Sequence, residues 1–401
     1  MNSAQIDLNQ RLPEARNQLA LLLEEQGYAT YWVGEGLTRA ALGKEPVSFS
    51  FVTSATSEQI IATLPTAVPT RTDGLSFVVP SPDGPTDLAP LGPARTIEEN
   101  LNGRGFRALA MAWRPSQSEW IDPHSGQKDL EDRQLGCIHT AKQDLSRSPL
   151  RVLQAARLIS DLALRPEASL EAAMGEAYRE GSPKVPTCNL RNELKQLLVC
   201  EDPAAGIELL RVTGVDQQLG VGGCEDAGPL MALMPAELPL RWTVWLREST
   251  GTRPLRKLRV DSDTTSLVQR LSASHPIEER FPQRRGRTLR KRCEQMGEEN
   301  CKKLIHLRTE ELRDVEGDAA EGSRIALKKL AETIAAETRQ AEEEKQRVEP
   351  AIGGQEIMEI LNLPPGPQIG AALAFLRKHI ATHPNENTEE KLKLLLQDWS
   401  H

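Results

Sequence analysis

The fold is decided by residues 28–62, which read YATYWVGEGLTRAALGKEPVSFSFVTSATSEQIIA. Apolar and small polar residues alternate over 28–33 and again over 47–52, as in strands that bury one face. Between these two segments, residues 37–42 have helical spacing and are followed by a glycine, which can close a helix. Ser54 to Thr56 are typical of a helix N-cap, so a second helix is expected directly after them. The order strand, helix, strand, helix predicts a sheet with helices packed on it.

A similar mixed pattern surrounds this stretch, and a helical pattern follows it. Residues 8–26 have apolar positions at helical spacing, and two more strands are expected at 75–79 and 87–91. From about Ser148 onward the periodicity is helical almost throughout, and it includes a long charged helix over 323–347. The sequence therefore predicts a sheet-containing head followed by an all-helical arm.

The composition is that of a folded protein with several domains. The chain has 401 residues, of which 39% are hydrophobic and 26% charged, and this excludes a disordered chain. It contains no run of 18 apolar residues and no visible secretory signal, so we expect no membrane partner and a cytoplasmic location. The six cysteines never have a CxxC spacing, which predicts reduced thiols and no zinc site. Aromatic residues make up only 4%, which argues against binding nucleic acid mainly by base stacking.

The net charge of −8 hides a local basic segment. Residues 201–250 carry 3 basic and 8 acidic side chains, whereas residues 251–300 carry 12 basic and 7 acidic ones. Six cations fall within nine residues, namely Arg284, Arg285, Arg287, Arg290, Lys291 and Arg292. Because the local field decides where a polyanion binds, this segment is a candidate RNA contact. The other interpretation is a solvated helix start whose charge is balanced by Glu294, Glu298 and Glu299.

Several segments, in a shared order, resemble the class II nucleotidyltransferase superfamily, which comprises the bacterial CCA-adding tRNA nucleotidyltransferases and poly(A) polymerases. Residues 34–39 correspond to the family's Gly-Gly-x-Val-Arg-Asp motif, and residues 47–53 to its strand with Asp-x-Asp. Residues 98–106 are similar to the segment that ends in Arg-Arg-Asp-Phe. Residues 149–157 resemble the start of the family's helical neck, and residues 354–370 resemble its last helices.

This resemblance covers nearly the whole chain and is weakest between about residues 215 and 285. It implies an α+β head with a nucleotidyltransferase-like mixed sheet, followed by an elongated all-α neck, body and tail. The implied boundaries are a head at 1–140, a neck at 141–215, a body at 216–320 and a tail at 321–401.

The positions that would carry the family's chemistry are changed in this sequence. Nucleotidyl transfer in the family uses two Mg²⁺ ions, and their aspartate ligands lie one residue apart on one face of a strand. Those positions are Ser48 and Ser50 here, and a neutral hydroxyl does not replace a carboxylate as a magnesium anchor. The aspartate of the family's Arg-Arg-Asp motif is Gly105. The sequence therefore predicts no catalytic residue and no metal site. Asp87 and Glu45 are the nearby acids that could substitute.

Several positions that hold the nucleotide in the family are retained as remnants. They are Gly34, Gly36, Arg104, Arg151, Arg157 and Glu193. The second glycine of the family's pair is Glu35, a bulky anion that would oppose a triphosphate. The family's helical arm also holds tRNA through phosphate contacts, which Arg285, Arg292 and Arg308 could make in this chain. Scaffold positions thus fit the family, whereas catalytic positions mostly do not.

These observations favour a catalytically degenerate member of the family that binds RNA, tRNA-like in kind, without adding nucleotides. It would need no cofactor. Its partner would be RNA, and an RNA-processing protein is the other candidate partner. One alternative is an active nucleotidyltransferase that adds CMP or AMP to RNA 3′ ends through a rearranged metal site and uses Mg²⁺. The other alternative is a protein-interaction scaffold.

Overall fold

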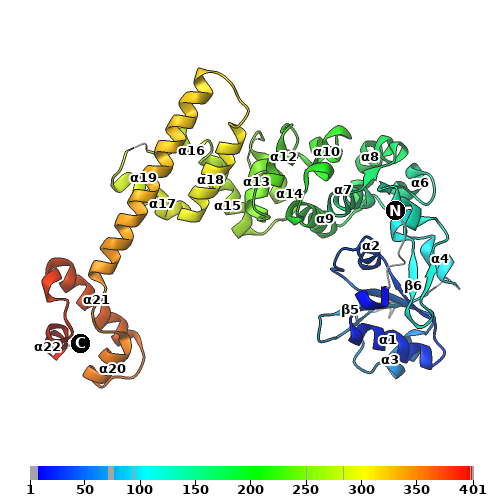
Figure 1. Cartoon of the computed structure of the whole chain (residues 1–401), viewed down its shortest axis with the longest axis horizontal. Coiled ribbons are helices and arrows are strands. Elements are labelled where there is room, and N and C mark those ends of the chain that lie inside the picture. Colours follow the sequence, from blue (N-terminus) through cyan, green and yellow to red (C-terminus); the bar gives the residue numbers. More distant parts are fainter. Residues whose placement is uncertain are drawn as a thin grey trace. The chain divides into compact units, whose positions relative to one another are not determined.

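A computed structural model describes residues 8–70, 76–92, 94, 96–249, 251–282, 284–397 and 399, with the backbone alone for residues 341–348. The chain divides into two compact units, Met1–Ser272 and Ala273–His401, and each is considered by itself (Figure 1). Across the described residues, no helix combines the length and the apolarity that a membrane crossing requires. The four-part division of the chain into head, neck, body and tail stays a prediction.

The first unit begins with a mixed sheet, as predicted. Among the described residues, seven strands pair in the order β3-β4-β5-β2-β1-β6-β7. The pair β2 and β5 is parallel, and the other neighbours are antiparallel. The strands are β1 (Thr30–Val33), β2 (Ser50–Thr53), β3 (Val68–Pro69), β4 (Phe77–Val79), β5 (Thr86–Pro90), β6 (Ala112–Arg114) and β7 (Glu119–Ile121).

The strand expected over 47–52 is shorter than predicted at its start. It begins only at Ser50, which lies opposite Val33 on β1. The chain turns at Gly34 into the next helix, so β1 offers no partner to the residues before Ser50. Ser48 therefore lies in the connecting segment. The strand expected at 75–79 is confirmed over Phe77–Val79, and residue 75 lies outside the described residues.

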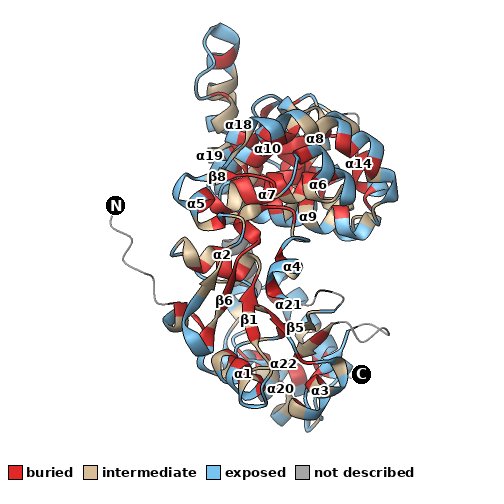
Figure 2. Ribbon diagram, turned by 90° about the vertical axis from the view of Figure 1, so that its right-hand side faces the viewer, coloured by how far each residue is buried: buried red, intermediate tan, exposed pale blue. Residues whose placement is uncertain are grey.

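Helices cover this sheet where the sequence predicted them. The expected helix over 8–26 is split at Pro13, which cannot donate a backbone hydrogen bond. Thr56 and Gln59 form a capping box at the start of α3, which confirms the predicted N-cap. Figure 2 shows the buried residues along the central strands. The helices of this part are η1 (Leu8–Arg11), α1 (Glu14–Glu25), α2 (Glu35–Ala41), α3 (Ser57–Thr63), α4 (Ile97–Leu101), η2 (Arg107–Leu109), η3 (Pro115–Gln117) and α5 (Gly126–Glu131).

The remainder of the first unit is helical apart from one small ladder. Strands β8 (Gln134–Leu135) and β9 (Arg165–Pro166) form a parallel pair. Helix α7 is buried along much of its length and packs against α9 and α10. The helices are α6 (Ala141–Arg147), α7 (Arg151–Leu162), α8 (Ala168–Gly181), η4 (Ser182–Lys184), α9 (Thr187–Val199), α10 (Ala204–Val212), α11 (Val215–Leu219), α12 (Ala227–Leu233), α13 (Leu238–Leu246), α14 (Arg253–Lys257) and α15 (Ser262–Ala273).

The second unit is helical throughout its described residues. The predicted charged helix is confirmed as α19, although it is not solvated on all sides, because Leu327, Leu330, Ile334 and Glu337 are buried. A separate apolar core holds the last three α-helices together. The helices are α16 (Ile277–Arg280), α17 (Arg287–Met296), α18 (Glu298–Glu311), α19 (Asp318–Val348), α20 (Gly354–Leu361), α21 (Pro367–Thr382), η5 (Pro384–Glu386) and α22 (Glu389–Gln397).

Candidate functional site

Ser48 and Ser50 lie at the end of the sheet where β2 begins. Ser50 is opposite Asp87 in the parallel pair of β2 and β5. Ser48 is exposed, and its backbone carbonyl packs against Gly36 of α2. A Cβ atom at position 36 would overlap that carbonyl oxygen, so only glycine allows this close approach. The two hydroxyls thus occupy the sheet edge that the sequence assigned to the family's paired aspartates.

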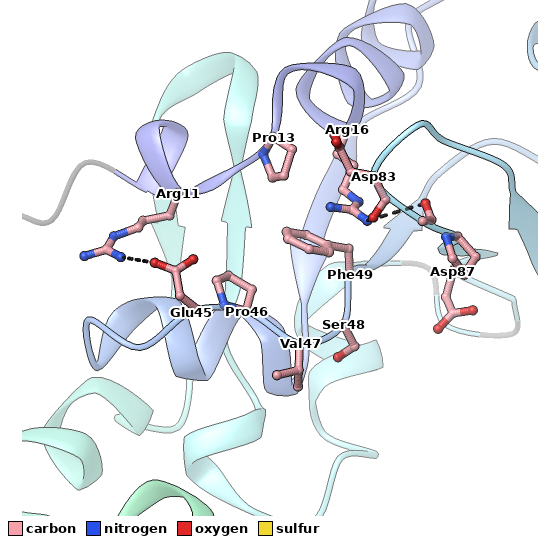
Figure 3. Close-up of a pocket in the computed structure, with 12 residues that line it drawn as sticks. Arg11, Pro13, Arg16, Glu45, Pro46, Val47, Ser48, Phe49, Asp83 and Asp87 are labelled. Carbon is pink, nitrogen blue, oxygen red and sulfur yellow. Dashed lines mark hydrogen bonds and ion pairs between the residues drawn. The ribbon is translucent and has the colours of Figure 1, made fainter. Parts of the chain in front are cut away.

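A polar hollow of about 430 Å³ opens beside Ser48 (Figure 3). Asp87 and Asp83 line it together with Glu45, which pairs with Arg11 at 3.2 Å. The guanidinium of Arg16 lies 3.6 Å from the ring centroid of Phe49. The hollow therefore presents charges of both signs.

Ser48 and Ser50 do not themselves supply the ligands that a pair of magnesium ions needs. Mg²⁺ prefers carboxylate oxygens in octahedral geometry, and Ser48 and Ser50 supply only neutral hydroxyls. In the described part of the chain, three His, Cys, Asp or Glu ligand atoms lie within 4.8 Å of one another only at Cys224, Asp226 and Glu248. There burial raises the pKa of Cys224 to about 12, which disfavours the thiolate that a metal needs. The expectation of no metal ligand stays a prediction.

Arg157 of α7 is held between two carboxylates from different elements. Its Nη1 and Nη2 atoms donate to Oε1 and Oε2 of Glu35 at 2.7 and 2.8 Å, and its Nε donates to Glu193 Oε2 at 2.7 Å. Arg157 itself is buried. Burial alone would lower the pKa of Arg157, but the hydrogen bonds and charges of Glu35 and Glu193 outweigh it and raise that pKa. The arrangement joins α2 to α7 and α9.

A second arginine of α7 fills the space beside Gly105. Gly105 has a φ of +84°, and a Cβ atom there would lie 2.8 Å from Arg151 Cδ and closer still to its guanidinium. Arg151 Nη1 donates to the backbone carbonyl of Asp144 at 2.9 Å, and Nη2 donates to that of Gly103. An aspartate could not occupy position 105 unless Arg151 moved.

Arg104 is partly buried, and its guanidinium has no carboxylate partner within the part of the chain that the structure describes. Its Nη2 donates to Asn100 Oδ1 at 3.1 Å, and its Nε has no hydrogen-bond partner among the described residues. Burial lowers the pKa of Arg104 to about 10. Its Nη1 would lie 3.4 Å from a Cβ atom at Gly34, the residue before α2. Arg104 is therefore a cation placed beside the glycine turn that opens α2.

The predicted remnants thus gather around two arginines of α7. Gly34 and Gly36 flank Glu35 at the start of α2, where Glu35 meets Arg157 and Glu193. The sequence identified Glu35 only as an obstacle to phosphate and missed that it is the partner of Arg157. It also missed the ion pair between Arg39 and Asp161. One feature of the sequence could have predicted the contact of Glu35 with Arg157. Arg157 and Glu193 match the family, whereas the acid Glu35 stands where the family has a glycine.

The basic segment lies in the second unit, at and before the start of α17. Arg284, Arg285, Arg287, Lys291 and Arg292 are exposed. Two of the three acids suggested as counter-charges, Glu298 and Glu299, pair instead with Lys302 at 2.8 and 3.2 Å. The interpretation that these acids balance the charge of the basic segment is therefore weakened.

Two other arginines of this region have carboxylate partners within the protein. Arg290 Nε lies 2.6 Å from Glu337 Oε2, and the Gly286 N–H donates to the other oxygen of Glu337 at 3.1 Å. Arg308 pairs with Glu278 at 2.8 Å and with Glu311 at 3.2 Å. Arg308 is therefore less available to phosphate than the sequence suggested. The buried Glu337 anchors the start of α17 on α19.

Among known proteins, the chain has sequence relatives that are tRNA nucleotidyltransferases. No family model matches the chain. It is 27% identical over 363 residues to the A-adding tRNA nucleotidyltransferase of Deinococcus radiodurans, covering 78% of this chain and 81% of that one. It is 28% identical over 204 residues to the CC-adding tRNA nucleotidyltransferase of Shouchella clausii, and the match spans 49% of this chain and about half, 51%, of the relative.

Solved structures share the fold. The CCA-adding enzyme of Bacillus stearothermophilus in complex with CTP superposes with a TM-score of 0.66 at 20% identity, covering 96% of both chains. The Thermotoga maritima CCA-adding enzyme complexed with tRNA gives 0.55 at 18% identity, covering 98% of both. The sequence relatives and the shared fold together support the resemblance of this chain to the class II nucleotidyltransferase superfamily.

Proposed function

We propose that this chain binds RNA of the tRNA kind without adding nucleotides to it. The observation that carries the proposal is the closed set of ion pairs around Arg157. A triphosphate that approached Arg157 would have to displace two carboxylates that already satisfy its guanidinium. It would also meet the charge of Glu35, and two like charges 4 Å apart repel by about 4 kcal/mol at an effective dielectric constant of 20.

The basic segment supports the RNA part of the proposal. Arg285 lines a hollow of about 620 Å³ together with Glu332, Arg339 and Gln340 of α19, and Ala335 and Ala336 are part of its wall, so that the hollow presents two guanidinium groups and one carboxylate. Small side chains leave room for a phosphodiester backbone, and guanidinium groups recognise phosphate by paired hydrogen bonds. The sequence relatives are tRNA nucleotidyltransferases, and one similar structure is a complex with tRNA.

A second candidate is an active RNA nucleotidyltransferase that adds CMP or AMP. One observation favours it, namely that Asp87 stands directly opposite Ser50 and that Asp83 and Glu45 line the same hollow as Ser48. These acids would have to replace both family aspartates. The carboxylate oxygens of Glu45, Asp83 and Asp87 do not all lie within 4.8 Å of one another, so a shift of the segment before Ser50 would be needed to gather them.

One assay separates the candidates. The full chain is incubated with tRNA lacking its 3′ end, labelled ATP or CTP and Mg²⁺, and both the gel shift and the extension of the RNA are measured. A CCA-adding enzyme serves as the positive control for extension. We expect a salt-sensitive shift of the RNA and no extension.

Two charge-reversal variants sharpen this assay. In the first, Arg284, Arg285 and Arg287 are each changed to Glu, and we expect the shift to be lost. In the matched control, Lys128, Lys142 and Lys195, which are exposed in the first unit, are each changed to Glu with the same change in net charge. Extension that disappears in Asp87→Asn would establish the active alternative. Neither shift nor extension would refute both and leave the protein-interaction scaffold.

A further inference from the structure

Two cysteines meet at the corner between α17 and α18. Cys293 lies near the end of α17, and Cys301 lies in the first turn of α18. Gly297, with a φ of +83°, forms the corner. Its N–H donates to the carbonyl of Cys293 at 2.8 Å, and its own carbonyl accepts from the N–H of Cys301 at 3.1 Å. The Cys301 and Cys293 side chains are hydrogen-bonded to each other.

The two thiols have different surroundings. Cys301 is fully buried, whereas Cys293 is partly exposed. The hydrogen bond with Cys301 lowers the pKa of Cys293, and this outweighs both burial and the nearby carboxylates of Glu337, Glu298 and Glu294. The same hydrogen bond, together with burial, raises the pKa of Cys301. Cys293 is thus the more accessible thiol of the pair, and Cys301 is buried beside it.

The other cysteines lack this combination. Burial raises the pKa of Cys137 to about 12 and that of Cys200 to about 11. Cys188 is exposed on α9, and its thiol has Asn189 as its hydrogen-bond acceptor. A reactive thiol beside a second thiol that can resolve its oxidised form is the arrangement of redox-sensing sites.

We propose that Cys293 and Cys301 are a redox modification site that forms a reversible disulfide when it meets a peroxide. The Cys293 thiolate attacks one peroxide oxygen, the O–O bond breaks, and sulfenic acid forms while the leaving oxygen departs as water after taking up a proton. The Cys301 sulfur then attacks the Cys293 sulfur, the S–O bond breaks, and a second water leaves. Overall two thiols and one hydrogen peroxide give one disulfide and two waters. A thiol reductant reverses the step by exchange.

The disulfide would fix α17 on α18 across the Gly297 corner. Helix α17 carries the exposed cations of the basic segment, and Glu337 already anchors its other end on α19. A bond at Cys293 would thus hold the second end of this short helix. The proposal concerns the thiols themselves and does not rest on RNA binding.

Peptide mapping of the full chain tests it directly. The reduced protein is treated with one equivalent of hydrogen peroxide, alkylated and digested with trypsin. Both cysteines fall in the one tryptic peptide 293–302, because no Lys or Arg lies between them. We expect this peptide to lack two hydrogen atoms and to carry no alkyl group, while the other four of the six cysteines stay alkylated. Full alkylation of peptide 293–302 after peroxide would overturn the proposal.

Single isosteric variants identify the order of the two steps. In Cys301→Ser we expect the sulfenic acid of Cys293 to persist and to be trapped by dimedone. In Cys293→Ser we expect Cys301 to remain a thiol. Cys188→Ser is the control for an exposed cysteine elsewhere and should leave the modified peptide unchanged. If a variant fails to fold, the peptide map of the wild-type protein still tests the proposal. A disulfide that joins Cys188 to another chain, formed in place of the Cys293–Cys301 disulfide, would also refute the site.

Discussion

Glu35 and Arg157 form a bidentate ion pair across 122 residues of sequence, with both carboxylate oxygens within 2.8 Å of the guanidinium. The resemblance places position 35 at the second glycine of the family's Gly-Gly motif. This chain has Glu35 there, and its carboxylate satisfies the guanidinium of Arg157. The pair is part of the contact between α2 and α7.

Removing the cation of this pair should cost much of the stability. We expect Arg157→Ala to lower the free energy of unfolding by about 3–5 kcal/mol, because two partly buried carboxylates lose their partner. Urea denaturation measures the change. The control is Arg211→Ala, which breaks a solvent-exposed pair with Glu208 and should cost far less, because water screens that pair. Equal losses in the two variants would contradict the role given to Arg157.

Restoring the family residue at position 105 should destabilise this chain. In Gly105→Asp the new side chain would collide with Arg151 and would also adopt a strained positive φ. We expect a loss of about 2–4 kcal/mol in urea denaturation. The double variant Gly105→Asp/Arg151→Ala should recover part of it, since the collision is removed. A single variant as stable as the wild type would show that Arg151 moves freely.

The stability should depend on pH through Glu24. Burial would raise the pKa of Glu24, but hydrogen bonds from Arg114 and from the Thr30 N–H outweigh it, so that the pKa is lowered in the folded protein. A depressed pKa stabilises the fold above the unfolded value of about 4.3, and this contribution is lost as the pH falls through the folded pKa.

Glu24→Gln should therefore cost about 1–3 kcal/mol at pH 7, and the difference from wild type should shrink as the pH falls below about 4. Denaturation at several pH values measures both effects. Glu25→Gln, which changes an exposed neighbour on the same helix, should show little difference at any pH. A cost for Glu24→Gln that stayed constant down to pH 3 would argue against the lowered pKa.

RNA affinity should fall with salt in proportion to the phosphate contacts that are made. The slope of log affinity against log salt should drop by about 0.7–0.9 for each exposed arginine of the basic segment that is removed. Arg285→Ala and Arg287→Ala should each show this decrease in a gel-shift titration at several salt concentrations. Arg290→Ala should affect stability more than the slope, because Arg290 is paired with Glu337. Slopes that did not change in the first two variants would remove this segment from the RNA contact.

Much of the fold could be predicted from local patterns. The capping box at Thr56 and the extent of the long charged helix follow from residues close together in the sequence. The start of β2 could not be predicted, because a strand needs a partner and β1 had already turned away at Gly34. The burial of Glu337 could not be predicted for a similar reason, since its partners Gly286 and Arg290 lie at the start of another helix, α17.

The sequence by itself predicted the order of the elements, the resemblance to the nucleotidyltransferase family, and the presence of Ser48 and Ser50 at the positions that this resemblance assigns to the paired aspartates. These depend on spacing and residue type, which can be seen along the chain. Only the tertiary structure decided which acid meets Arg157 and which side chain fills the space beside Gly105. The physical reason is that the partner of a buried charge depends on the path of the folded chain, and its identity is not encoded in any local periodicity.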